Sequence, residues 1–123
     1  KRITLTASDG NSLMAYAALI FGESATMCSE GAVLGVPGVY VDPVGRGYTD
    51  EQEREYGLVF NFTSAAQDQA IKKGVEILAP YDREGWQERG RKLVAEKIDV
   101  ADMLYRVAME RPYAKKRAQG LKF

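Results

Sequence analysis

Short apolar runs that end at glycine or at a polar turn alternate with amphipathic stretches along most of the chain. One run spans residues 18–21, a second spans residues 38–41 and a third spans residues 58–62. Runs of this length are typical of buried parallel strands, and the stretches between them are long enough for helices. Branched and polar residues also alternate over residues 3–7, which indicates a further short strand or an extended entry segment. The pattern therefore predicts an α/β fold, with a partial Rossmann-like parallel sheet of three to four strands and flanking helices.

Helices are predicted between and after these runs, at residues 13–17, 26–34, 50–56, 64–78, 82–97 and 100–110. Asn11 or Ser12 is placed to cap the first helix, and Asp99 the last. Thr49 with Gln52, and Ser64 with Gln67, have the spacing of capping boxes. Gly35 and Gly57 are placed to end the second and third helices. The apolar residues expected to face inward are Met27, Ala32, Val33, Leu34, Ala70, Ile71, Val75, Leu78, Met103, Leu104 and Val107.

Pro80 divides the chain into two parts of different character. Residues 1–79 contain the predicted strands and form the Rossmann-like segment. Residues 80–123 form a helical C-terminal appendix that packs on it, and Trp86 is expected to anchor that appendix rather than to stack on a ligand. The basic residues after Pro112 are expected to be a solvated end.

Composition narrows the classes of function. Lys plus Arg equals Asp plus Glu at 17 each, so the net charge is zero, and the pI is about 6.5 with a mean hydropathy of -0.30. This balance argues against a nucleic-acid partner, and the lack of a long apolar run argues against a membrane span. Without histidine, a histidine-based triad and mixed His–Cys zinc sites are excluded, and no cofactor or metal is expected. The acidic residues 50–55 are expected to stay solvated rather than bind a divalent ion, and Cys28 to face the core.

The first residue is Lys1, and no signal-peptide pattern follows it. We therefore expect a cytoplasmic protein of which this chain is a part, with an amino-terminal domain upstream. A parallel sheet of so few strands leaves an open edge, which such chains commonly hide by association. The chain on its own is accordingly expected to form a homo-oligomer.

The most informative segment for chemistry runs from Gly22 to Glu30, where small residues join a predicted strand to a predicted helix. Such a turn leaves backbone amides open at the start of the helix, where the helix dipole favours an anion such as phosphate. The hydroxyls of Ser24 and Thr26 add donors, and Glu30, one turn beyond Thr26, could accept from a ribose diol. The plainer alternative is a tight turn and a helix cap, with Glu30 in solvent.

The same segment carries a resemblance to a known family. Several segments of the chain resemble uncharacterised GT-B-like proteins found among polysaccharide-biosynthesis genes. They are GESATM at residues 22–27, SEGAVLGVP at residues 29–37, and residues 40–41, 51–53, 56–58 and 97–100. That family is similar to UDP-N-acetylglucosamine 2-epimerases and to the transferase that adds N-acetylglucosamine in peptidoglycan synthesis. The resemblance covers about residues 13–107. It implies the carboxyl-terminal half of a GT-B-type domain that binds a nucleotide sugar, with UDP-sugar as the expected ligand.

The resemblance also implies roles for individual residues. The phosphate-binding turn falls on residues 22–26, that is Gly22, Glu23, Ser24, Ala25 and Thr26, and the ribose-binding carboxylate falls on Glu30. Glu51 or Gln52 is the nearest candidate for a sugar contact, and Arg46 could approach a phosphate, although solvent is its plainer environment. Catalytic groups in these relatives come largely from the other half of the protein. The expected function is nucleotide-sugar binding for a glycosyltransferase or an epimerase-like enzyme, incomplete alone, and the alternative is a non-catalytic binding or assembly module.

Overall fold

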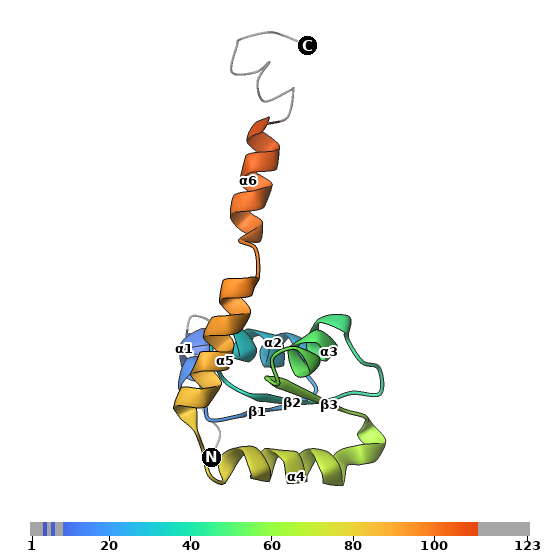
Figure 1. Cartoon of the computed structure of the whole chain (residues 1–123). Coiled ribbons are helices and arrows are strands. Elements are labelled where there is room, and N and C mark those ends of the chain that lie inside the picture. Colours follow the sequence, from blue (N-terminus) through green and yellow to red (C-terminus); the bar gives the residue numbers. More distant parts are fainter. Residues whose placement is uncertain (1–3, 5, 7–8, 111–123) are drawn as a thin grey trace.

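Three parallel strands form a small sheet at the centre of the fold in the computed structural model of the chain (Figure 1). The strands are β1 (Ile20–Gly22), β2 (Gly38–Val41) and β3 (Val59–Phe62), and they lie side by side in that order. The helices are α1 (Gly10–Tyr16), α2 (Ala25–Val33), α3 (Gly47–Arg54), the 3-10 helix η2 (Ser64–Ala66), α4 (Gln67–Leu78), α5 (Arg83–Glu96) and α6 (Val100–Glu110). The structure describes residue 4, residue 6 and residues 9–110, so the strand predicted at residues 3–7 lies largely outside it. The α/β prediction and the parallel sheet are confirmed.

The central strand β2 is buried along its whole length because it has a strand on each side and a helix on each face. β1 pairs only with β2, so it is an edge strand. The prediction that the run at residues 18–21 is a buried strand was therefore wrong in its burial, because residues 18–20 are only partly buried and Phe21 is 48% exposed. A strand with one neighbour in so narrow a sheet has too little cover to bury both faces.

Helices cover both faces of the sheet, and a separate apolar cluster lies on each face. α2 and α3 lie on one face and α4 lies on the other (Figure 1). Tyr40 and Leu58 are central to the first cluster, together with Cys28 of α2. Val39 and Val41 of β2 meet Ile77 of α4 in the second cluster. The alternation of β2 side chains between the two faces thus joins two cores into one fold.

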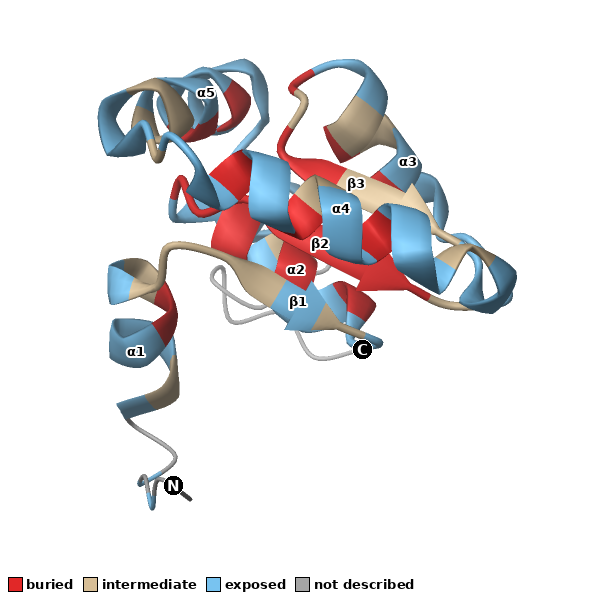
Figure 2. Cartoon of the chain, turned by 90° about the horizontal axis from the view of Figure 1, so that it is seen from below, coloured by how far each residue is buried: buried red, intermediate tan, exposed pale blue. Residues whose placement is uncertain are grey.

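α4 packs through a different face from the predicted one. Its buried residues are Ala70, Gly74 and Ile77, whereas Ile71, Val75 and Leu78 are 56%, 60% and 46% exposed. Gly74 explains the difference, because its missing side chain lets Leu19 and Phe21 come within van der Waals distance of the helix. Figure 2 shows the narrow buried stripe of α4 against the sheet and its exposed outer surface. The predicted capping box of Ser64 and Gln67 is also wrong, since no side chain caps α4.

α2 also approaches the sheet through small residues, which are Ala25, Cys28, Gly31 and Ala32. Gly31 lies directly against the Ile20 side chain, with no room for a methyl group between them. The larger residues Met27, Val33 and Leu34 were predicted to reach the sheet and are instead 47%, 52% and 39% exposed. The helix therefore turns its bulkiest apolar side chains away from the strands.

The helix ends follow the predictions only in part. Gly35 and Gly57 have the left-handed backbone expected after α2 and α3, with φ of 72° and 59°. The predicted capping box of Thr49 and Gln52 is wrong, because Thr49 lies inside α3 and its hydroxyl donates to the Arg46 carbonyl at 2.9 Å.

The predicted N-caps of the first and last helices, α1 and α6, also differ in outcome. At α1 the N-cap is Asp9 rather than Asn11 or Ser12, and its side chain makes no capping hydrogen bond. Asp99 does cap α6, since its carboxylate accepts from the Asp102 amide at 3.0 Å.

α5 packs where β2 and β3 begin and is part of the core. Its Leu93 is 3% exposed, and Trp86 packs against both apolar clusters, as expected of an anchor. Gly90 lies so close to Gly35 that an added Cβ atom would be 2.6 Å from the Gly35 Cα. The division of the chain at residue 79 stays a prediction, but α5 closes the apolar core of residues 1–79.

α6 projects away from the rest of the fold (Figure 1). The prediction that Met103, Leu104 and Val107 point inward was wrong, because these side chains are 41%, 58% and 46% exposed. None of the helices in the described residues is long and apolar enough to cross a bilayer.

Candidate functional site

The predicted phosphate-binding turn lies at the carboxyl end of β1, where Gly22 ends the strand and α2 begins at Ala25. Ser24 is the N-cap of α2, and its hydroxyl accepts from the Met27 amide at 3.3 Å. The Ala25 and Thr26 amides belong to the first turn, where no intrahelical acceptor exists. This turn therefore presents two backbone donors and the positive end of a nine-residue helix to an anion.

A small hollow of about 190 Å³ adjoins this turn. Its lining residues are Phe21, Gly22, Glu23, Val41, Gln67 and Ile71. Binding pockets for small molecules are typically about 300–1,000 Å³. The hollow is therefore large enough for only a part of a nucleotide sugar, and the rest of such a ligand would lie outside it.

The segment between β2 and α3 lies at the same edge of the sheet. The Asp42 carboxylate accepts from the Val44 amide at 2.7 Å, and this hydrogen bond is the main cause of a lowered pKa of Asp42. Burial raises the pKa of Tyr40, and the nearby Asp42 adds to the effect. Arg46 is exposed and forms the N-cap of α3, near enough to influence both groups electrostatically. Asp42 and Arg46 place opposite charges at this part of the edge, and the Asp50 carboxylate lies near Gly45 of the same segment.

Glu30 lies apart from the turn. It is exposed and lines a different hollow, of about 240 Å³, with Asn11, Val33 and Leu34. Val33 and Leu34 are at the carboxyl end of α2, so Glu30 faces α1 rather than the hollow beside Gly22. The structure thus places Ser24, Ala25 and Thr26 together and does not bring Glu30 into their hollow.

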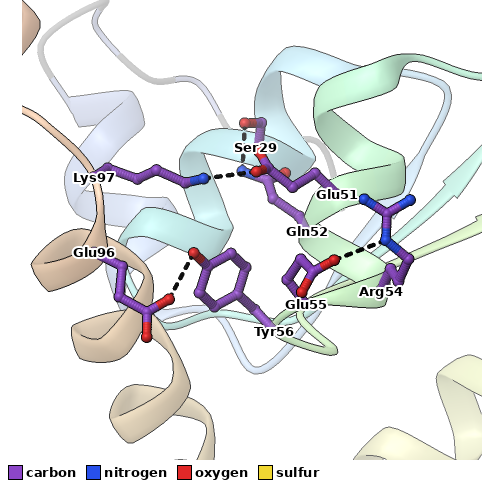
Figure 3. A network of polar contacts seen from close by, with 8 residues as sticks. All are labelled: Ser29, Glu51, Gln52, Arg54, Glu55, Tyr56, Glu96 and Lys97. Atoms are coloured by element: carbon purple, nitrogen blue, oxygen red, sulfur yellow. Dashed lines mark hydrogen bonds and ion pairs between the residues drawn. The ribbon is translucent and has the colours of Figure 1, made fainter.

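Glu51 and Gln52 belong to α3, where they point toward Lys97 and Ser29 (Figure 3), and they line a different hollow from the one beside the turn. Gln52 is 7% exposed, and its Nε2 donates to the Ser29 Oγ at 2.8 Å, which links α3 to α2. The Oε1 of Gln52 is buried without a hydrogen-bond partner. Glu51 accepts from the Lys97 Nζ at 2.7 Å. Both side chains are therefore engaged in contacts between helices, and the sugar contact expected of them stays a prediction.

Sequence reasoning missed the polar network that holds α5 to α3. The Tyr56 hydroxyl donates to the Glu96 Oε2 at 2.9 Å, and Lys97 pairs with Glu51 beside it (Figure 3). Burial is the main cause of a raised pKa of Tyr56, and the contact with Glu51 raises the pKa of Lys97. These pairs are 40 and 46 residues apart in sequence, so no local spacing could indicate them.

Cys28 and the acidic segment have no visible catalytic arrangement. Cys28 is 0% exposed, and burial raises its pKa to about 11, so the thiol stays protonated and inert at neutral pH. Within residues 9–110 and the two described residues before them, no group of three or more carboxylate or thiol side chains is placed to hold a metal ion. Glu53 instead accepts from the Asn61 side chain at 2.7 Å, and Glu55 pairs with Arg54.

Comparison of the chain with protein-family models, with curated proteins and with solved structures found no match.

Proposed function

We propose that this chain is the nucleotide-sugar-binding part of a GT-B-type protein of surface polysaccharide synthesis, and that it takes a UDP-sugar at the carboxyl edge of the sheet. The proposal joins the resemblance carried by residues 22–37 to the geometry of the turn between β1 and α2. In this proposal a second domain closes over the carboxyl edge and supplies the catalytic groups of a glycosyltransferase or an epimerase-like enzyme. The chain alone binds and does not catalyse.

The observation that carries the proposal is the pair of open amides at Ala25 and Thr26, at the end of a parallel strand. Helix starts in this position bind phosphate through backbone donors and the helix dipole, without a basic side chain. The hydroxyl of Ser24 already accepts from Met27, which fixes the turn and keeps the two amides pointing outward from the helix end. In the proposal the diphosphate binds there.

The remaining residues of the proposed site lie outside the hollow beside this turn. Glu30 binds the ribose in the proposal, and a ligand must extend along α2 to reach it, because Glu30 and Gly22 line different hollows. Arg46 approaches the diphosphate from the segment after β2. Glu51 and Gln52 would have to leave their contacts with Lys97 and Ser29 to touch a sugar, so they are the weakest members of the set.

The test removes one amide and leaves the helix in place. Ala25→Pro does this, because proline is well tolerated at the first helical position and Ser24 already has the extended backbone that precedes proline (φ -94°, ψ 99°). Loss of one hydrogen bond to a charged group costs about 1.5–3 kcal/mol of binding free energy. The dissociation constant for UDP should therefore rise roughly 10- to 100-fold in titration calorimetry. Uridine, which lacks the diphosphate, should bind the variant as it binds the parent chain.

The matched control is Arg83→Pro, which places proline at the first position of α5, away from the carboxyl edge. It should leave UDP affinity unchanged, and far-UV circular dichroism should show the same helix content for all three proteins. The proposal fails for this chain when UDP does not bind the parent, or when Ala25→Pro and Arg83→Pro bind UDP equally.

A second candidate function is a non-catalytic assembly module that keeps the fold without the chemistry. The observation that favours it is the amount of apolar surface left uncovered on helices, as on α4 at Ile71, Val75 and Leu78. Contiguous exposed apolar surface marks interaction sites in soluble proteins. A thermal-shift screen with UDP, GDP, CMP and dTDP sugars separates the two functions. A binder gains about 2.7 kcal/mol of stability at a ligand concentration 100 times the dissociation constant, whereas an assembly module shows no shift.

A further inference from the structure

α6 presents one apolar face that none of the other described residues of the chain covers. Val100, Met103, Leu104 and Val107 recur at the spacing of one helix face, and they are 53%, 41%, 58% and 46% exposed. Every side chain described in α6 is exposed, and the helix stands clear of the body in Figure 1. A helix of 11 residues is marginal in water unless its apolar face is packed. α6 therefore needs a partner surface to be stable.

A matching surface lies between α2 and α5, and we call it the α2–α5 groove. It consists of two adjoining hollows of about 460 and 390 Å³ that share Val33 and Val94. These two side chains are each 52% exposed, and Ile98 at one end of the groove is 67% exposed. The two helices that border this surface, α2 and α5, are in contact with each other. An apolar helix face is the kind of ligand that such a groove takes.

The chain's own α6 leads away from this groove. Only residues 97–99 join α5 to α6, and Lys97 is extended (ψ 147°). The Lys97 side chain is also held by Glu51 of α3. Turning α6 back over its own α5 would require this link to reverse direction and would disturb that ion pair. A second copy of the chain meets no such restriction, and a net charge of zero puts no long-range repulsion between copies.

We propose that two copies of this chain exchange α6 helices, so that each α6 lies in the α2–α5 groove of the other copy. The face of an 11-residue helix that meets a partner has an area of roughly 300 Å². Two such contacts, each counted on both surfaces, bury roughly 1,200 Å², which is the lower limit for a stable specific interface. A single α6–α6 pair would bury about half of that. The area therefore favours reciprocal exchange, a common route to symmetric dimers.

The experiment measures mass by light scattering after size exclusion, from about 10 to about 200 µM protein, because an interface of this size gives modest affinity. The parent chain should have twice the 13.6 kDa mass of one copy at the upper concentrations. Leu104→Glu in α6 and Val94→Glu in the groove should each reduce the mass twofold, to one copy. Both positions are more than half exposed, so the fold of the single copy should survive, as far-UV circular dichroism can verify.

The matched control is Met109→Glu, which adds the same charge to the same helix. Met109 is 55% exposed and lies about 140° around α6 from Leu104, away from the apolar face. It should remain dimeric. Mixing the Leu104→Glu and Val94→Glu chains leaves one intact helix and one intact groove, which bury only about half of the area of the full exchange, so the mixed pair should associate much more weakly than the parent chain.

Four results would overturn the exchange. They are a parent chain of single-copy mass at every concentration, a dimer that survives Leu104→Glu, a dimer that survives Val94→Glu, and loss of the dimer in Met109→Glu. Survival of Val94→Glu alone would show that α6 pairs with itself or with another surface. This inference does not rest on nucleotide binding, since Leu104 and Val94 line no part of the turn between β1 and α2.

Discussion

The close contact between α5 and the end of α2 predicts that Gly90→Ala destabilises the fold. Without that contact the same substitution would stabilise it. Gly90 is inside α5, and replacing an exposed glycine inside a helix with alanine normally stabilises a protein by about 1 kcal/mol. Here the new Cβ would lie 2.6 Å from the Gly35 Cα and 3.1 Å from the Ala32 carbonyl oxygen. Both are backbone atoms, so neither can rotate away, and one helix must move.

Overpacking of a core typically costs 1–3 kcal/mol, and a clash with backbone belongs at the upper end of that range. After subtraction of the gain in helix propensity, Gly90→Ala should lower the free energy of unfolding by about 1–2 kcal/mol. For a chain of this length that corresponds to a melting temperature lower by roughly 4–8 °C. Urea titration monitored by circular dichroism measures this change in the free energy of unfolding. The slope of that free energy against urea concentration should be unchanged.

Gly47→Ala is the matched control, because Gly47 begins α3 and an added Cβ would meet nothing within 4 Å. It should be neutral or slightly stabilising, since alanine lowers the entropy of the unfolded chain. All samples should be compared at one low protein concentration, because association adds to apparent stability. If Gly90→Ala proves as stable as the parent or more so, the packing of α5 against Gly35 is refuted.

Two further predictions concern buried groups. Cys28 has a pKa raised to about 11 in the folded state, so its contribution to stability is complete below the unfolded pKa near 9 and is lost as the pH rises from there towards 11. Cys28→Ala should flatten the fall in stability over that alkaline range in urea titrations, and an equally steep fall would contradict the burial of the thiol. Gln52→Ala removes the buried link to Ser29 and should cost about 1–3 kcal/mol. Gln69→Ala, at an exposed position of α4, should stay within about 0.5 kcal/mol of the parent, and equal effects of the two changes would argue against the link.

The sequence predicted the strands well because their signals are local. The run at residues 38–41 lies between Pro37 and a polar turn, and it is the fully buried central strand. Gly35 likewise predicts the end of α2, because the left-handed backbone that ends many helices favours glycine at that one position. Predictions that depend on a few adjacent residues were therefore confirmed by the structure.

The faces of the helices were harder to predict because periodicity selects the most apolar stripe, whereas packing selects the stripe that fits. In α4 the apolar stripe through Ile71 and Val75 stays outside, and the stripe through Gly74 packs because it allows a close approach. A sheet of three strands also has too little area to cover every apolar residue of its helices. The candidate turn at Ser24 was predicted together with its cap, while the placement of Gln52 against Ser29 depends on packing across 23 residues.

The order of the strands has a consequence for any ligand at the turn between β1 and α2. The sheet is built in one direction, from β1 through β2 to β3, so the chain never reverses its course across the described sheet. In open α/β sheets, ligand crevices form where that course does reverse, at a topological switch point. A strand on the free side of β1 would create such a point beside Gly22 if it came after β3 in the chain, whereas a strand directly preceding β1 would continue the same course. Such a neighbour would deepen the hollow beside Gly22 into a crevice, so the free edge at β1, one of the two edges of the sheet, is where nucleotide affinity would be gained or lost.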